Sequence, residues 1–407
     1  MSEWKEYKLG DIADVQTGPF GSQLHMSDYK MSGTPIITVE HLGENRIIHN
    51  NLPLVGKDDK QRLIKYTLKE GDIVFSRVGS VDRRAYVSDQ EDGWMFSGRC
   101  LRVRVKKEKV DSKFLSFYFG QENFKETIRR IAVGATMPSI NTTILSDIEI
   151  SIPKLSVQKV IETILGNLDD KIDLLHRQNK TLEQLAETLF RQWFVVEAEE
   201  IWEKKKLGEL LTITSSKRIF YSEYVSAGIP FYRSKEIIEL RNTGVTNSEL
   251  YISNDRFDEI NNKFGSPIEG DILMTSVGTL GVAYRVRKSD KFYFKDGNLT
   301  WFKDFKGLPS SIVYLWLISK IGQEELAAIT IGSTQEALTI EGLKGISFKI
   351  PPKAKIDEYE VEFNTIISKI EINQTQILTL TRLRDTLLPK LMSGEVRVKM
   401  SELGFQD

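Results

Sequence analysis

The sequence is poor in the residues that build disulfides and metal sites. Its 407 residues contain one cysteine, Cys100, and four histidines, His25, His41, His49 and His176. A single cysteine excludes an intramolecular disulfide and a zinc site built from cysteines, and the histidines show no ligand spacing. We therefore expect no metal site in this chain, and we expect His41 and His49 to lie in surface loops.

The sequence also lacks the motifs of common enzymes and of membrane proteins. It has no GxxxxGK[ST] phosphate loop, no HExxH, no GxSxG and no GxGxxG. The [DN]PP[YF] motif of amino-methyltransferases is missing too, since the only Pro-Pro pair is Pro351-Pro352. The amino terminus lacks a signal-peptide pattern, and the longest strongly apolar run, Ile312 to Ile318, is too short to span a bilayer. We expect a cytoplasmic protein that is not an enzyme.

Neither sign of charge dominates the whole chain, whose formal net charge is -1. Lysine and arginine nevertheless exceed aspartate and glutamate by 23 to 21 in residues 1–155 and by 22 to 18 in residues 201–355. Acidic residues lead by 9 to 5 in residues 156–200 and by 9 to 6 in residues 356–407. Because DNA is a polyanion, we expect it to bind the two basic segments and to be repelled by the two acidic ones.

The second half of the chain repeats the first at a shift of 198 residues. Leu9-Gly-Asp-Ile12 returns as Leu207-Gly-Glu-Leu210. Gly71-Asp-Ile-Val-Phe75 returns, one residue out of step, as Gly270-Asp-Ile-Leu-Met274. A period of this length indicates duplicated domains and not a solenoid of short repeats.

Each half ends in a stretch that is nearly free of glycine and proline and has apolar residues at helical spacing. We predict helices over about 156–196 and 356–388, each a rod of about 50 Å. The apolar residues form a seam that needs a partner helix, and the pattern also places Leu185 and Leu383 on it. The residues that we expect in helix pairing or subunit docking are Leu168, Ile172, Leu175, Asn179, Leu182, Leu189, Ile366, Ile370, Asn373, Ile377, Leu380 and Leu387.

We expect the two long helices to pair with each other and to run antiparallel, because the chain passes through a globular domain between them. The alternative is that each helix packs only against its own globular domain. Asn179 and Asn373 fall on or beside the seam, where a buried polar residue can fix the register of a helix pair. A solvated position is the alternative for either asparagine.

The predicted fold class is α+β, with two duplicated globular domains joined by two long antiparallel coiled-coil helices and related by a pseudo-twofold axis. The predicted limits are 1–155 for the first globular domain, 156–198 for the central helix, 199–355 for the second globular domain, 356–392 for the distal helix and 393–407 for a C-terminal tail.

Polar and basic residues gather at the turns that the repeat preserves, whereas the segments between these turns differ. Such side chains can bind phosphate or read base edges, and the divergence suggests two related readers of different targets. For any single residue, a structural role in its turn or plain solvent exposure is the alternative. The candidate DNA-binding residues are Ser22, Gln23, Arg77, Ser80, Arg83, Arg84, Arg99, Thr136, Ser139, Asn141, Lys217, Arg218, Arg233, Lys235, Ser276, Thr279, Ser333, Thr334 and Gln335.

The chain resembles the specificity subunit of Type I restriction-modification enzymes over essentially its whole length. Residues 165–195, which end in Phe190-Arg-Gln-Trp-Phe-Val195, are similar to the central helix of that family. Residues 383–398, which include Leu387-Leu-Pro-Lys-Leu-Met392, are similar to the end of its distal helix. The chain differs from the family at the helix starts, where a Glu-Gln pair is common.

The openings of the two globular domains also resemble that family. Gly18-Pro-Phe-Gly-Ser22 and Gly228-Ile-Pro-Phe-Tyr-Arg233 are similar to openings of its target recognition domains. The resemblance implies a subunit that reads a bipartite site in double-stranded DNA, with one target recognition domain for each half-site. A rod of about 50 Å would suit two major grooves about 34 to 36 Å apart.

The resemblance further implies which partners the chain has. The helices would dock two methyltransferase subunits, which methylate adenine N6 with S-adenosylmethionine, and through them two restriction subunits that use ATP and Mg. The chain itself would bind no cofactor and supply no catalytic residue.

Two other classes of function remain open from the sequence. A protein-protein scaffold without DNA binding would share the helices, but it would lack strongly salt-dependent binding to DNA. A stand-alone nuclease with an unrecognised motif would cleave DNA with magnesium and without partners.

Overall fold

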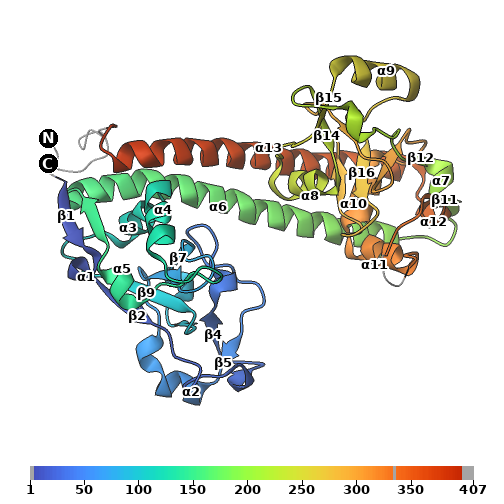
Figure 1. Cartoon of the computed structure of the whole chain (residues 1–407). Coiled ribbons are helices and arrows are strands. Elements are labelled where there is room, and N and C mark those ends of the chain that lie inside the picture. Colours follow the sequence, from blue (N-terminus) through green and yellow to red (C-terminus); the bar gives the residue numbers. More distant parts are fainter. Residues whose placement is uncertain (1–3, 333–335, 397–407) are drawn as a thin grey trace. The chain divides into compact units, whose positions relative to one another are not determined.

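A computed structural model of the chain describes residues 4–332 and 336–396 (Figure 1). Its contacts divide the chain into two compact units, one made of residues 1–171 with 381–407 and the other of residues 172–380. Each unit contains one globular part and a stretch of both long helices. The units thus divide the helices themselves, and the domain limits proposed from composition remain predictions. Residues 397–407 of the proposed tail lie outside the described residues.

The first unit is built around an antiparallel sheet of order β2-β9-β6-β7. Strand β6 is buried on both faces, because Ile73 and Phe75 contribute to one apolar core while Val74, between them, contributes to another. A short run of β-branched and aromatic residues is typical of a strand that is covered on both sides. The strands are β2 (Ala13–Thr17), β6 (Ile73–Ser76), β7 (Arg84–Tyr86) and β9 (Cys100–Val105).

Two smaller sheets complete the first globular part. One has the order β3-β5-β4-β8, in which β4 and β8 run parallel, and the other pairs β1 with β10. The remaining elements are β1 (Lys5–Lys8), α1 (Leu9–Ile12), β3 (Tyr29–Lys30), β4 (Thr34–Ile37), β5 (Leu54–Val55), α2 (Lys57–Arg62), β8 (Met95–Phe96), α3 (Ser112–Tyr118), α4 (Glu122–Ile131), α5 (Thr142–Ser146) and β10 (Glu149–Ile152).

The two histidines that were expected in surface loops differ in their surroundings. His49 is exposed and lies 2.5 Å from a Glu91 carboxylate oxygen. His41 is buried, so its predicted exposure is wrong. Its Nδ1 lies 3.1 Å from the backbone nitrogen of Thr38 and 2.9 Å from the Thr38 hydroxyl. The ring therefore closes the turn that follows β4, and this local role draws it into the fold.

The second unit repeats the strand order of the first. Its main sheet has the order β12-β19-β16-β17, a smaller sheet has the order β13-β15-β14-β18 with β14 and β18 parallel, and β11 pairs with β20. The elements are β11 (Glu203–Lys206), α7 (Leu207–Leu210), β12 (Thr212–Thr214), β13 (Tyr224–Val225), β14 (Ile229–Tyr232), α8 (Ser234–Thr243), β15 (Tyr251–Ile252), α9 (Asn254–Phe264), β16 (Ile272–Thr275), β17 (Ala283–Arg285), β18 (Tyr293–Phe294), β19 (Leu299–Lys303), α10 (Ser310–Ile318), α11 (Lys320–Ala328), α12 (Ile340–Gly345) and β20 (Ser347–Ile350).

The two globular parts differ in the segments that connect the shared strands. After β4 the first part has only a short 3-10 turn over Val39–His41, whereas after β14 the second part has the ten-residue helix α8. Helix α9 has 11 residues, against six in α2. The duplication therefore preserves the sheets and varies the structure between them.

The long helices are α6 (Leu155–Arg191), which continues as a π-helix over Gln192–Val196, and α13 (Lys353–Met392). Within the second unit they lie side by side (Figure 1). Asn179 faces Asn373, and further along α6 the Trp193 ring stacks on Tyr359, which lies earlier on α13. One helix advances while the other returns, so the pair is antiparallel. This confirms the predicted fold class.

The end of α13 belongs to the first unit. Leu391 and Met392 are buried in the same apolar core as Ile161 and Leu165 of α6. Arg384 of α13 is buried and donates to Asp169 of α6 at 2.8 Å. The two helices thus contact each other here as well, through an ion pair beside an apolar core.

Most of the predicted seam residues lie in apolar clusters. Leu168 is half-buried, and Asn179 and Asn373 contact each other. The residues that pack in the clusters are Ile172, Leu175, Leu182, Leu189, Ile366, Ile370, Ile377, Leu380 and Leu387.

The placement of Leu185 and Leu383 on the seam is wrong, since both side chains are 45% exposed. Their next neighbours, Ala186 and Arg384, occupy the buried positions instead. Alanine is weakly apolar and arginine is charged, so neither gives a strong seam signal in the sequence.

The two helix starts are anchored differently. The Gln158 side chain is fully buried near the start of α6, where it accepts from the Asp111 amide at 2.9 Å and donates to the Pro153 carbonyl at 2.7 Å. The equivalent position near the start of α13 is Ile356, which is buried in the apolar core of the second unit. The departure from the family pattern therefore exchanges a polar anchor for an apolar one.

Loss of Arg384 is expected to destabilise the first unit. Arg384→Ala leaves the Asp169 carboxylate largely buried without its cationic partner, which costs about 3 kcal/mol of unfolding free energy. Urea unfolding of the full chain measures this loss. Arg382→Ala removes an exposed arginine from the same helix and serves as the control, with an expected change below about 0.5 kcal/mol. Equal stability of the two variants would contradict the expectation.

Candidate nucleic-acid interface

Four loops of the first globular part meet at one end of its main sheet. Strands β2 and β6 end there, and β7 and β9 begin there, because the sheet is antiparallel. The Arg77 amide donates to the Arg99 carbonyl at 2.8 Å, and the Gly79 amide donates to the Pro138 carbonyl at 2.8 Å. We call the surface of residues 18–23, 77–83, 97–99 and 133–141 the first loop face.

Arg77 lies at the centre of these contacts. Its Nη1 donates to the Gly98 carbonyl at 3.2 Å, and its guanidinium carbon lies 5.4 Å from the centre of the Phe20 ring. The Phe20 ring is 51% exposed although it is apolar. A Cβ at Gly18 would lie 2.1 Å from the Ser97 carbonyl oxygen, so only glycine allows the two loops to approach this closely.

The candidate residues of the first loop face differ in how freely they can bind a ligand. Ser22, Ser80, Arg99 and Thr136 are exposed. The others also have structural roles. Three of them are half-buried: Gln23 accepts from the Tyr66 hydroxyl, Arg83 donates to the Leu42 carbonyl, and Ser139 donates to the Val133 carbonyl. The fourth, Asn141, is exposed and caps α5 by accepting from the Ile144 amide.

Arg84 has a different role from the one expected. Its guanidinium is buried and donates to the Ser116 carbonyl at 2.7 Å. Burial lowers the pKa of Arg84 to about 10. The neighbouring Ser116 hydroxyl donates to Asn45, whose amide donates to Asp169 of α6 at 3.3 Å. Arg84 therefore belongs to a polar network that links the first globular part to the long helices, and it is removed from the candidate interface.

The second globular part brings together the equivalent four loops. The Ser276 amide donates to the Asn298 carbonyl at 2.9 Å, and the Leu338 amide donates to the Ser276 carbonyl at 2.9 Å. The Ser215 hydroxyl lies 3.3 Å from the Leu299 carbonyl and joins the loop after β12 to the start of β19. We call the surface of residues 215–221, 276–282, 295–298, 330–332 and 336–338 the second loop face.

The basic residues at the second loop face are held by carboxylates and an aromatic ring. Arg218 is paired with Asp296 at 2.8 Å. The Lys217 ammonium lies 4.6 Å from the centre of the Phe264 ring.

Arg233 and Lys235 lie beside the second loop face, because the Lys295 amide donates to the carbonyl of Tyr232, the residue before Arg233. Arg233 is paired with Glu236 at 2.7 Å and with Glu249 at 3.1 Å, and Lys235 is paired with Glu249 at 3.0 Å. The hydrogen bonds to Glu236 raise the pKa of Arg233 above its usual value. These cations are therefore charged and are already engaged with carboxylates.

The remaining candidates of the second half fall into three groups. Thr279 is exposed. Ser276 is buried, and its hydroxyl lies 2.5 Å from that of Thr300, so the expected surface role of this side chain is wrong. The tight turn after β16 directs it inward. Ser333, Thr334 and Gln335 lie outside the described residues.

Exposed apolar side chains on the loop faces were not among the candidates. Phe20 and Met137 lie on the first face, and Phe220 and Tyr221 lie on the second. The predicted candidates are all residues whose side chains form hydrogen bonds. The available signal was the presence of aromatic residues in the segments in which the two halves differ. Aromatic rings and apolar side chains can contact thymine methyl groups and sugars, so these residues belong to the candidate interface.

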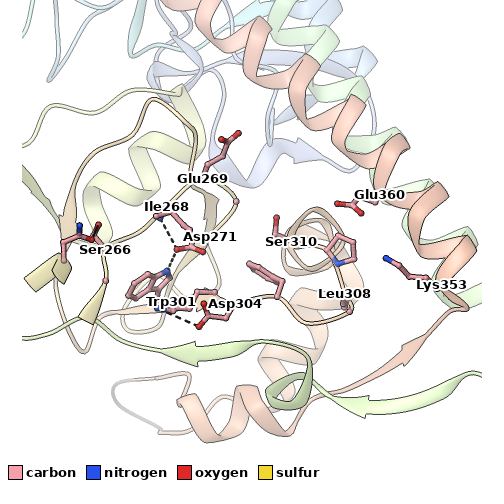
Figure 2. A pocket seen from close by; sticks show the side chains of 17 residues that line it. Ser266, Ile268, Glu269, Asp271, Trp301, Asp304, Leu308, Ser310, Lys353 and Glu360 are labelled. Atoms are coloured by element: carbon pink, nitrogen blue, oxygen red, sulfur yellow. Dashed lines mark hydrogen bonds and ion pairs between the residues drawn. The ribbon is translucent and has the colours of Figure 1, made fainter. Parts of the chain in front are cut away.

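A cavity of about 660 Å³ opens at the other end of the second main sheet, before β16 (Figure 2). Its lining includes Glu269, Asp271, Asp304 and Glu360. The Asp271 carboxylate accepts from the Trp301 indole at 2.8 Å, and burial raises the pKa of Asp271. These four carboxylates outnumber the two lysines of the lining, Lys303 and Lys353, and the cavity lies away from the loop face, so it is not included in the candidate interface.

The described residues, 4–332 and 336–396, contain no group of three or more histidine, cysteine, aspartate or glutamate side chains placed to hold a metal ion. Within the same part of the chain, no helix is long and apolar enough to cross a membrane.

Comparison with known proteins gives matches in both halves. The Type I restriction modification DNA specificity domain matches residues 1–184 and again residues 199–382. The chain is 25% identical to the Type I restriction enzyme MjaIX specificity subunit of Methanocaldococcus jannaschii, over 98% of this chain and 94% of that protein. It is 27% identical to a putative type I restriction enzyme specificity subunit of Haemophilus influenzae, over 81% of this chain and 86% of that protein.

A solved structure has a similar fold. The S subunit of a Type I restriction-modification system from M. genitalium superposes with a TM-score of 0.63, over 96% of each chain, at 16% sequence identity. At this identity the structural similarity supports the fold alone, whereas the family model matches most of both halves of the sequence. The chain therefore belongs to the family of the Type I restriction modification DNA specificity domain.

Proposed function

We propose that the chain is the DNA sequence-specificity subunit of a Type I restriction-modification system and that each loop face reads one half of a bipartite site. The observation that carries this proposal is that the same sheet presents the same four loops twice, with different side chains each time. A repeated frame with altered loops suits two readers of different sequences.

The first loop face offers arginine for base readout. Arg77 is already oriented by the Gly98 carbonyl and the Phe20 ring, so little side-chain entropy remains to be lost on binding. Arg99 is exposed beside it. An arginine that reaches the major groove can donate two hydrogen bonds to guanine O6 and N7.

The second loop face offers a different chemistry. Arg218 and Lys235 must exchange Asp296 and Glu249 for phosphate when they bind DNA. The Lys235–Glu249 pair is exposed on both sides and contributes little to stability, so this exchange is easy, whereas Asp296 is largely buried and holds Arg218 more firmly. A released carboxylate can accept a hydrogen bond from cytosine N4. The second half-site is therefore expected to differ in sequence from the first.

The long helices carry exposed apolar residues that suit the docking of partner subunits. Leu174 and Leu185 lie on α6, about three helical turns apart, and Ile372 and Leu383 lie on α13 at the same interval. The two pairs are equivalent at the 198-residue shift. Equivalent surfaces in both halves suit two copies of one partner. We assign this partner as the methyltransferase subunit, as the family membership favours.

The partners would supply the chemistry. The methyltransferase subunits would methylate adenine N6 with S-adenosylmethionine, after flipping the base out of the stack. Restriction subunits that use ATP and Mg would join through them. This chain would then bind no cofactor, supply no catalytic residue and act on DNA in the cytoplasm.

Independent reading by the two loop faces predicts separate effects on the two half-sites. In a host that carries the chain and its partners, Arg99→Ala is expected to relax base preference in one half-site, by about tenfold in discrimination, while Thr279→Ala alters only the other. Sequencing of methylated adenines measures both. Lys171→Ala, at an exposed lysine of α6, is the control and is expected to change neither. If either face variant altered both half-sites, separate reading would be wrong.

Substitutions at two adjacent residues of α6 can separate the docking of partner subunits from the pairing of the helices. Leu174 is 40% exposed and Leu175 is 1% exposed. Leu174→Asp is expected to keep the unfolding midpoint and to reduce co-purification of methyltransferase subunits at least about tenfold, since a buried interface tolerates an unpaired charge poorly. Leu175→Asp is expected to lower the unfolding midpoint. Lys180→Asp, at an exposed position on another side of α6, is the charge control. Normal co-purification of Leu174→Asp would exclude this surface.

A further inference from the structure

The helix pair of the second unit contains one polar layer beside an apolar one. Asn373 is fully buried on α13, and its Nδ2 donates to Asn179 Oδ1 on α6 at 2.8 Å. One turn away, Leu175 of α6 and Ile377 of α13 pack in an apolar cluster. Asparagine therefore faces asparagine, and leucine faces isoleucine.

The 198-residue repeat relates each residue of the apolar layer to a residue of the asparagine layer. At the shift of 198 residues, Leu175 corresponds to Asn373, and Asn179 corresponds to Ile377. Each helix thus has one asparagine and one apolar residue a turn apart, but in the opposite order. Elsewhere the seams of the two halves also differ, since buried Ala186 of α6 corresponds to buried Arg384 of α13.

Two copies of the same helix would not match in this register. Two α6 helices would place Asn179 of each opposite Leu175 of the other. Two α13 helices would place Asn373 of each opposite Ile377 of the other. Each such pair would place two amides against apolar side chains without the amide–amide hydrogen bond, and an amide that is removed from water without a hydrogen-bond partner is destabilising.

The two layers next to the asparagines do not discriminate between the pairing of α6 with α13 and the pairing of two identical helices. Ile172 and Leu380 pack together, and their repeat equivalents, Ile370 and Leu182, also pack in an apolar cluster. Pairs of identical helices would place Ile172 against Leu182 and Ile370 against Leu380, which are equally apolar contacts. Among these layers, discrimination depends on the asparagines. In the first unit, the Arg384–Asp169 ion pair adds to it, because pairs of identical helices would lose that pair as well.

We propose that the Asn179–Asn373 layer selects the partner of each long helix: it favours the other half of the same chain and disfavours the same half of a second copy. A single polar pair in an apolar seam is known to act in this way in coiled coils. This selection keeps two different loop faces in one molecule, and it operates whether or not the chain binds DNA.

The test uses the full chain with Asn179→Leu and Asn373→Leu, in which this layer becomes apolar. Copies with two different affinity tags are unfolded together in guanidinium, refolded at high concentration and captured first through one tag and then through the other. We expect the yield of mixed-tag dimers to rise by about tenfold or more over the unsubstituted chain, because two unpaired amides no longer penalise pairs of identical helices.

A matched control moves the polar layer without removing it. Leu175→Asn, Asn179→Leu, Asn373→Ile and Ile377→Asn together keep the residue types and keep asparagine opposite asparagine. This variant is expected to give the unsubstituted yield. An unchanged yield in the double-leucine variant, or an equal rise in the control, would overturn the proposal.

A single substitution gives a second reading if the double variant fails to refold, as judged by circular dichroism. Asn179→Leu makes the pair of two α6 helices apolar and leaves Asn373 without its partner in the native pair. It is therefore also expected to raise the yield of mixed-tag dimers. An unchanged yield from this variant would contradict the proposal.

Discussion

The antiparallel packing of α6 against α13 in one register is the constraint on which the rest of the structure depends. In the second unit, Phe190 of α6 and Phe363 of α13 share the core on which the globular part is built. In the first unit, Leu391 and Met392, near the end of the described chain, complete the core of the part that comes first in the sequence. A slip of one helix along the other would remove apolar residues from each core. The helix pair is therefore part of both folds and not merely a connection.

The two halves of the chain are duplicates of one frame. They differ mainly in the loops that form the two loop faces and at a few buried positions of the long helices. The sheets keep their strand order and their alternation of side chains between two cores. The loops at one end of each sheet differ in charge: Arg77 of the first face lies over a ring, whereas Arg218 of the second is paired with a carboxylate. On the helices the repeat is broken by reversed asparagines, which prevent the halves from being interchangeable as pairing surfaces.

The fold could be predicted from the sequence because the 198-residue period and the apolar seam depend on spacing alone. The individual site residues depended on tertiary contacts. Arg83 and Arg84 are adjacent, but Arg84 begins β7 and is buried while Arg83 lies in the loop before it, and only the position of the strand decides which of them turns inward. Ala186 replaces Leu185 on the seam because the helical period selects the position and not the most apolar residue. Phe20 could not be predicted as an exposed ring, because an aromatic residue in the sequence favours the core and only the loop packing leaves this ring half exposed.

Cross-linking across the helix pair tests the register most directly. Cysteines at positions 179 and 373 of the full chain can be joined by a short thiol-reactive linker, and the native Cys100 does not interfere because burial raises the pKa of its thiol to about 12. Mass spectrometry of the digested product identifies the joined peptides. An efficient link within one chain is expected for Asn179→Cys with Asn373→Cys, and little link is expected for the out-of-register control Asn179→Cys with Ile366→Cys. Equal linking of the two variants, or links only between chains, would contradict this register.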